Sequence, residues 1–291
     1  MTRPIRLALA AATILALSAA APAGAADPPP PGGLLDLVGA RALGTSAATA
    51  GTTGTEAIFV NPGAIGVRTG FVVDTVGVNE RRGATTTSRY LGALVIDAVS
   101  SPVAASFGYL ASLADRQRGN IFFLGLAGPV SDRLHVGVQG RYLKLGGVEP
   151  INAITADAGI HYEVSEMVSF GVAGFNLVPT SHPVLLPQAM GAGLAVGSDT
   201  SFRVQADWKG TWLPHGQLGN RYAAGAGAFL GGMVALRVGW MRDELFKTTW
   251  WSSGVGLVTG DGFAIDVGYK QAFETTSARE MALSLRYYPP Q

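Results

Sequence analysis

The chain has 291 residues, of which 48% are hydrophobic and only 14% are charged, and its formal net charge is +1. This balance argues against nucleic-acid binding, which needs concentrated basic residues. No cysteine is present, so the fold must be held by backbone pairing and packing alone.

Residues 1–25 have the three parts of a secretory signal peptide. Arg3 and Arg6 precede an apolar run from Leu7 to Ala21, and Ala23-Gly24-Ala25 forms a small-residue cleavage site. A first transmembrane helix is the weaker interpretation, because the run falls short of the ~20 residues that a span needs. We therefore expect cleavage after Ala25 and export. Together with the strand pattern of residues 67–291 described below, this predicts a Gram-negative outer membrane as the destination.

Residues 26–66 form a second region, with a Pro-rich linker followed by a compact segment. The run Pro28-Pro29-Pro30-Pro31 predicts an extended linker. From residue 34 to 66 the chain is rich in Ala, Thr and Gly and lacks clean alternation. We expect a compact non-barrel segment with one or two short helices, and a disordered leader is the alternative.

From residue 67 to 291 the hydrophobic pattern has period two, which is typical of half-buried strands. Phe202, Val204 and Ala206, for example, alternate with Arg203 and Gln205. About fourteen strands are expected. They begin near Val67, Thr85, Pro102, Asn120, Leu134, Asn152, Met167, Val184, Thr200, Arg221, Met233, Thr249, Gly262 and Arg279.

High apolarity without a convincing spanning helix favours a closed barrel, because backbone groups in lipid must be paired internally. The predicted fold is all-β: a transmembrane antiparallel β-barrel with apolar residues toward lipid and charged residues toward the lumen. Tight turns alternate with longer polar connectors, as in outer-membrane barrels. Trp and Tyr near strand ends, Trp250 among them, suit interfacial belts.

Lumen residues are predicted from the parity of the charged positions along each strand. Such charges usually pair across strands, and apolar residues of the same parity fit either plug packing or a hydrophobic ligand. The candidates for lining the lumen or binding a ligand are Val72, Asp74, Leu91, Val95, Arg141, Asp157, His161, Arg203, Asp207, Arg237 and Asp266.

The segment from Arg41 to Gly66 resembles the N-terminal segment of the long-chain fatty-acid transporter (FadL-like) family and of PorV/PorQ-type barrels. The resemblance rests on Arg41-Ala42-Leu43-Gly44, on Glu56 to Gly66 with its Asn61-Pro62 pair, and on the strand end Phe170 to Leu177. It implies fourteen strands, an N-terminal plug inside the barrel and passage of hydrophobic ligands. The plug residues that it singles out are Arg41, Gly44, Phe59, Asn61 and Pro62.

Two functions remain open on this reasoning. Passive transport of small hydrophobic molecules is favoured by the plug and the apolar lumen positions, whereas a PorV-like docking barrel, with export-machinery proteins as partners, is favoured by the short loops. An outer-membrane enzyme is the least favoured reading. The four histidines have no catalytic or metal-binding spacing. We therefore expect no catalytic residues, no bound metal or cofactor and no nucleic-acid partner. The expected partner of the outer face of the barrel is outer-membrane lipid.

Overall fold

The computed structural model describes most of the chain from residue 38 onward. The predicted signal peptide and most of the Pro-rich linker, up to residue 37, lie outside the described residues. The described ranges are 38–47, 49–67, 70–82, 86–113, 117–147, 150–198, 200–213, 216 and 218–289.

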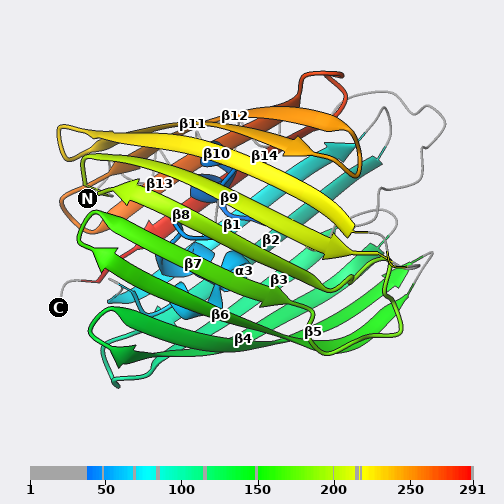
Figure 1. The fold of residues 1–291 in the computed structure, drawn as a ribbon, viewed down its shortest axis with the longest axis horizontal. Helices are drawn as coiled ribbons and strands as arrows, with labels where there is room; N and C mark the ends of the chain where they lie inside the picture. The colour runs from blue at the N-terminus through cyan, green and yellow to red at the C-terminus, as the bar shows by residue number, and fades with distance from the viewer. Residues whose placement is uncertain are drawn as a thin grey trace.

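Fourteen antiparallel strands close into a single barrel, which confirms the predicted fold (Figure 1). Each strand pairs with its neighbours in sequence, and β1 closes the ring by pairing with β14, with Val73 opposite Tyr287. The strands are β1 (Phe71–Arg82), β2 (Thr86–Asp97), β3 (Ala104–Leu113), β4 (Gln117–Ser131), β5 (Leu134–Gly147), β6 (Ile151–Ser165), β7 (Val168–Phe175), β8 (Ala189–Gly197), β9 (Phe202–Trp212), β10 (Leu218–Leu230), β11 (Val234–Asp243), β12 (Thr248–Val258), β13 (Phe263–Ala272) and β14 (Arg279–Tyr287).

The strands begin within a few residues of their predicted starts, and β8 differs most. It begins at Ala189 rather than near Val184. Pro183 and Pro187 have no backbone N–H to donate to a ladder, and the backbone N–H of Leu186 donates to the carbonyl of His182 instead. Residues 176–188 therefore form a long connector between β7 and β8.

The connectors define two ends of the barrel. One end has tight turns such as residues 132–133, 166–167 and 231–233, and the other includes the long connector 176–188. We call these the turn end and the loop end. Because the number of strands is even, β1 begins and β14 finishes at the turn end.

The outer face of the barrel is apolar and carries aromatic rows. The rings of Tyr109, Phe122 and Tyr142 follow one another across β3, β4 and β5, with centroids 5.3 and 6.2 Å apart. At the turn end, Phe263 stacks on Tyr287 at 4.5 Å. Outward Leu236, Val238 and Trp240 on β11 are exposed, whereas Arg237 between them points inward, as predicted.

Two sequence predictions of facing are wrong. Leu91 is 58% exposed, whereas Tyr90 and Leu94 are buried, so Leu91 and Val95 lie on the outer parity of β2. Trp250 does not belong to an outer belt, because its ring packs near Met241 and lies 5.3 Å from the ammonium of Lys270 inside the barrel.

The N-terminal segment lies inside the barrel, where Figure 1 shows it in blue, enclosed by the strands. It consists of helix α2 (Ala40–Thr45), the 3₁₀ turn η1 (Gly54–Glu56), the short helix α3 (Ala57–Val60) and the 3₁₀ turn η2 (Pro62–Ala64). Its Leu43, Ile58 and Ile65 form one core with inward residues of β1 to β6. The described part, residues 38–67 without 48, is called the plug below.

Candidate functional site

Glycines on the inner wall let the plug backbone approach the strands. Four of them lie on neighbouring strands β10 to β13 beneath α2, and a Cβ at any one would meet backbone of α2. Gly225 pairs with Gly239 and Gly254 pairs with Gly268 across the ladders. We call this group the α2 floor. Gly44 of the plug completes the approach, since a Cβ there would lie 3.1 Å from the Cα of Gly254.

A second glycine group, the Asn61 floor, lies on β5, β6 and β7 and consists of Gly137, Gly159 and Gly171. A Cβ at Gly137 would collide with the carbonyl oxygen of Pro62, and one at Gly159 with the side chain of Asn61. The plug therefore rests directly on strand backbone at two places. Glycine is used here because only it leaves room for another backbone at this distance.

Asn61 is fully buried, and its amide is satisfied by both the plug and the wall. Its Nδ2 donates to the carbonyl of Ile160 at 3.0 Å and to that of Thr49 at 3.3 Å, and its Oδ1 accepts from the N–H of Gly63 at 3.0 Å. A buried amide with three partners stabilises one position of the plug. Pro62 follows as the first residue of η2.

Two predicted lumen carboxylates hold the plug. Asp74 accepts a 2.6 Å hydrogen bond from the hydroxyl of Thr55. Asp207 accepts from the backbone N–H groups of Thr49 and Ala50, at 3.0 and 3.3 Å. Val72 is buried in the core shared by plug and wall. These candidates therefore contribute to plug packing.

Further plug contacts come from Glu56, Gln205 and Gln139, which are not among the lumen and plug candidates named from the sequence. Both oxygens of Glu56 accept backbone N–H groups, from Arg41 and Ala42, at 2.8 Å each. Gln205 donates to the hydroxyl of Thr45 at 2.8 Å, and Gln139 donates to the carbonyl of Ile58 at 2.8 Å. The sequence signal for these contacts is the polar character of inward positions in the predicted plug and strands. The sequence does not tell which of these polar residues form hydrogen bonds with one another.

Arg141 and Asp157 form a buried ion pair at 2.8 Å, and Asn176 joins them. Arg141 donates to the Asn176 side chain at 2.5 Å, and the N–H of Asn176 donates to Asp157 at 2.8 Å. Asn176 also donates to the carbonyl of Pro187 at 2.8 Å, which joins the two ends of the connector 176–188. Asp157 therefore pairs with Arg141, while His161 is buried separately on the inner face of β6.

A chain of charges crosses the wall near the turn end. Arg237 donates to Asp266 at 2.6 Å, and Arg286 binds the other oxygen of Asp266. Arg286 also lies 3.9 Å from Asp74. This chain links β11, β13, β14 and β1 and reaches the plug through the Asp74–Thr55 bond. Arg203 stands on β9 and donates to Ser169 at 2.9 Å.

Two cavities lie on opposite sides of α2. The loop-end cavity, of about 90 Å³, is lined by apolar Leu43, Phe59, Phe175 and Met241, and by polar groups that include Lys209. The ammonium of Lys209 lies 4.8 Å from the centroid of the Phe175 ring.

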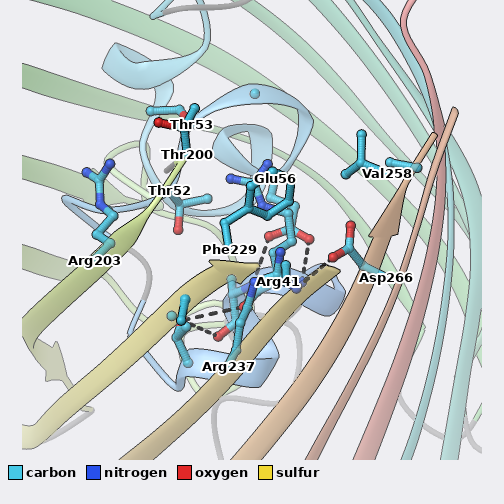
Figure 2. A pocket seen from close by; sticks show the side chains of 18 of the residues that line it. Arg41, Thr52, Thr53, Glu56, Thr200, Arg203, Phe229, Arg237, Val258 and Asp266 are labelled. Atoms are coloured by element: carbon cyan, nitrogen blue, oxygen red, sulfur yellow. Dashed lines mark hydrogen bonds and ion pairs between the residues drawn. The ribbon is translucent and has the colours of Figure 1, made fainter. Parts of the chain in front are cut away.

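The turn-end cavity is larger, about 420 Å³, and reaches the β8–β9 turn at Ser198. Figure 2 shows Arg41 and Glu56 of the plug together with Arg237 and Asp266 of the wall, and Arg203 apart from them in this view. Ala42 of α2 lines both cavities. Helix α2 is therefore a partition between the two ends of the lumen.

Neither a helical membrane span nor a metal centre is found in the described part of the chain. No described helix is long and apolar enough to cross a membrane. Among the residues outside the masked gaps, no group of three or more His, Asp or Glu side chains could hold a metal ion.

The described chain is thus a plugged, fourteen-stranded antiparallel barrel, and solved structures share that architecture. No family model matches the sequence, and no curated protein matches it. The toluene transporter TbuX of Ralstonia pickettii superposes with a TM-score of 0.65 at 14% identity, covering 89% of this chain and 100% of that one.

Two further structures agree on the fold. The CymD monoaromatic hydrocarbon channel gives a TM-score of 0.64 at 13% identity, covering 89% of this chain and 99% of the other. A Pseudomonas aeruginosa FadL homologue gives 0.59 at 10% identity, covering 86% and 98%. At such identities the likeness shows the fold alone, which resembles outer-membrane transporters of hydrophobic molecules. PorV-type barrels are not among these structures.

Proposed function

We propose that this protein is an outer-membrane barrel through which small hydrophobic molecules pass without an energy source. The outer face supports the location, since an apolar band with aromatic rows is what lipid requires of a barrel. The likeness to TbuX, CymD and the FadL homologue supports the substrate class, because these are titled a toluene transporter, a monoaromatic hydrocarbon channel and a FadL homologue.

The observation that carries the proposal is the pair of cavities divided by α2. In the described strands the ladders shift register only at Pro129/Ser131 and Glu163/Ser165, both beside turns, so the paired strands leave no side opening in the wall next to α2. A molecule that enters the loop-end cavity among Leu43, Phe59 and Met241 therefore has to pass the plug to reach the turn end. Displacement of α2 would join the two cavities.

The docking alternative rested on short loops alone. No contact within the described residues and no title among the three structures favours an export partner. An enzyme is likewise not favoured, because the compared structures are titled as transporters and channels and the buried charges pair with one another. The docking function and the enzyme function therefore have no support beyond the sequence.

Uptake by intact cells tests the proposal. A Gram-negative host that lacks its own hydrocarbon channels, and that expresses this chain, should contain a heat-modifiable barrel in its outer-membrane fraction. It should take up labelled toluene several-fold faster than the same host with an empty vector. An inserted barrel that leaves toluene uptake at the empty-vector rate would contradict the transport proposal.

A further inference from the structure

The outer face of the wall contains an apolar hollow on β4 to β7, strands that lie side by side in Figure 1. Its volume is about 470 Å³, and every side chain that lines it is apolar. Ala158 and Gly174 pair across β6 and β7, and they leave space beside the larger, exposed side chains of Leu126, Val138 and Ile160. We call the hollow lined by these five residues the outer hollow.

The outer hollow continues along β5 and β6 toward the loop end. Gly140 lies two residues beyond Val138 on the same face of β5, and a Cβ at Gly140 would meet no atom within 4 Å. Ala156 pairs with Gly140 across the ladder, so neither strand fills this level with a large side chain. A strip of small residues does not by itself define a ligand, but the residues at its loop end do.

Two cations lie at the loop end of this strip. Arg118 on β4 and Lys144 on β5 are exposed, and they are diagonal neighbours, because Arg118 pairs with Gly146, two residues beyond Lys144. Side chains of this length can meet across such a diagonal. Within the described residues, neither side chain forms a hydrogen bond or an ion pair. No Asp or Glu occupies a described outward position of β3 to β6 between these cations and the outer hollow.

An aromatic row lies between the two cations and the strip. Phe122 and Tyr142 pair across β4 and β5, and Tyr142 lies two residues from Lys144. Such rings mark the membrane interface in outer-membrane barrels. Asn120, which pairs with Lys144, accepts a 2.7 Å hydrogen bond from the hydroxyl of Tyr109 through its Oδ1, so its Nδ2 is the donor beside Lys144. Donors therefore lie on the headgroup side of the rings, and the apolar strip lies on the hydrocarbon side.

The distance along β5 fits one leaflet of a membrane. Six residues separate Lys144 from Val138, which is about 20 Å at the usual strand rise. With a strand tilt of about 40°, the outer hollow lies about 15 Å below Lys144, close to half of a hydrocarbon core. The longer loops of such barrels are extracellular, so the loop end belongs to the outer leaflet.

We infer that the outer face of β4 to β6 binds a phosphorylated lipid of the outer leaflet. Its phosphate lies between Arg118 and Lys144, because both side chains form charge-assisted hydrogen bonds with phosphate. One acyl chain passes Gly140 and Ala156 and ends in the outer hollow. A free phosphate ion would use the cations and leave the strip uncovered. This inference rests on the outer-membrane location in the proposed function, and it does not depend on transport.

Native mass spectrometry of the full-length barrel in a nonionic detergent tests the inference. The probes are diphosphorylated lipid A and the same lipid after removal of both phosphates. The phosphorylated lipid should bind at least about tenfold more tightly than the dephosphorylated one. Lys144→Gln should weaken its binding at least about fivefold, and Lys144→Arg should retain it. The heat-modifiable band shows whether each variant is folded.

Lys247→Gln is the matched control for the headgroup. Lys247 is also exposed at the loop end, but it lies in the connector between β11 and β12, on the far side of the ring from β4 and β5. This variant removes the same charge from the same residue type. Binding of the phosphorylated lipid should not change.

A second pair of variants tests the acyl position. Ala158→Phe fills the outer hollow and should weaken binding of the phosphorylated lipid at least about threefold. Because Ala158 points outward, the added ring does not enter the core shared by plug and wall. Ala206→Phe is the control, since Ala206 is exposed on β9 and does not line the outer hollow. Lipid binding in Ala206→Phe should equal that of the unaltered chain.

Four results would overturn the inference: equal affinity for the two lipids, equal loss in Lys144→Gln and Lys247→Gln, full displacement of the lipid by millimolar inorganic phosphate, or unchanged binding in Ala158→Phe. Failure of the proposed function is read separately, from toluene uptake in cells. A barrel that passes toluene but does not discriminate between the two lipids refutes only the lipid site. One that prefers the phosphorylated lipid but passes no toluene keeps the site and refutes the hydrocarbon route.

Discussion

Glycines on the inner wall set how closely the plug approaches the strands. Because a Cβ in the Asn61 floor would meet plug backbone or the buried Asn61 amide, these positions are constrained by space. Gly140 on β5 points outward instead, and a Cβ there would meet no atom within 4 Å. The two kinds of position can be told apart by one substitution at each, and β5 offers both, in Gly137 and Gly140.

Gly137→Ala should displace the plug. The added methyl group meets the carbonyl oxygen of Pro62, a backbone atom that cannot rotate away, so the cost should be about 1–3 kcal/mol, as for other overpacked sites. We expect a lower unfolding temperature on heat-modifiability gels and faster protease cleavage within the plug. Gly140→Ala is the control, since no atom lies within 4 Å of its Cβ. Equal behaviour of the two variants would show that the plug does not rest on this floor.

At the scale of the elements, the strands could be predicted from sequence because alternation is a local signal. The facing of β2 could not. Arg89 and Asp97 share a parity with Leu91, but Asp97 ends the strand, and Arg89 is exposed near its other end. Charges at strand ends therefore do not mark the lumen face. Tyr90, Leu94 and Ile96 point inward because the plug offers β2 an apolar surface.

The contacts that fix the plug were beyond sequence reasoning for another reason. Asn61 binds Ile160, and Glu56 binds the N–H groups of α2. Such pairs are set by how the whole plug lies in the closed barrel, and no periodicity encodes that position. The resemblance to a family motif singled out Asn61-Pro62, but it did not identify Ile160 on β6 as the hydrogen-bond partner of Asn61.

Helix α2 can be locked to the wall by a single engineered bond. The hydroxyl oxygens of Ser46, just after α2, and Ser252 on β12 lie 2.8 Å apart, and the chain has no cysteine that could mispair. In the double variant Ser46→Cys, Ser252→Cys, a disulfide of ~2.05 Å requires only a small approach of the two sulfur atoms. The oxidised protein should stay folded and lose most of its toluene uptake, and a membrane-permeant reductant should restore it.

Each single cysteine variant serves as the control, because it carries the same loss of a hydroxyl without the bond. Uptake in both should stay near that of the unaltered chain. If the disulfide is complete by thiol titration and uptake is unchanged, the route does not require α2 to move from β12. The two cavities would then have to connect through another part of the plug.

At the scale of the whole molecule, the plug fills a barrel that is otherwise wide enough to conduct. Eight-stranded barrels are filled by their own side chains, whereas barrels of 16–18 strands enclose aqueous channels. Fourteen strands lie near the second case. The inward charges of the wall, such as Asp74, Asp207 and Arg237, are polar enough to be hydrated once the plug is gone.

Deleting residues 34–60 should therefore leave a folded barrel that conducts ions. The wall keeps its fourteen ladders and the Arg141–Asp157 and Arg237–Asp266 pairs, none of which belongs to the deleted segment. In planar bilayers the single-channel conductance should rise well above that of the intact protein, because an unfilled barrel of this size approaches those that enclose aqueous channels. Loss of Leu43 and Ile58 from the shared core should lower the unfolding temperature without preventing closure of the barrel.

A deletion of residues 28–31, which precede the described plug, is the control and should leave conductance at the level of the intact chain. Unchanged conductance in a folded barrel that lacks residues 34–60 would mean that the wall alone closes the lumen, and a route gated by the plug would have to be abandoned.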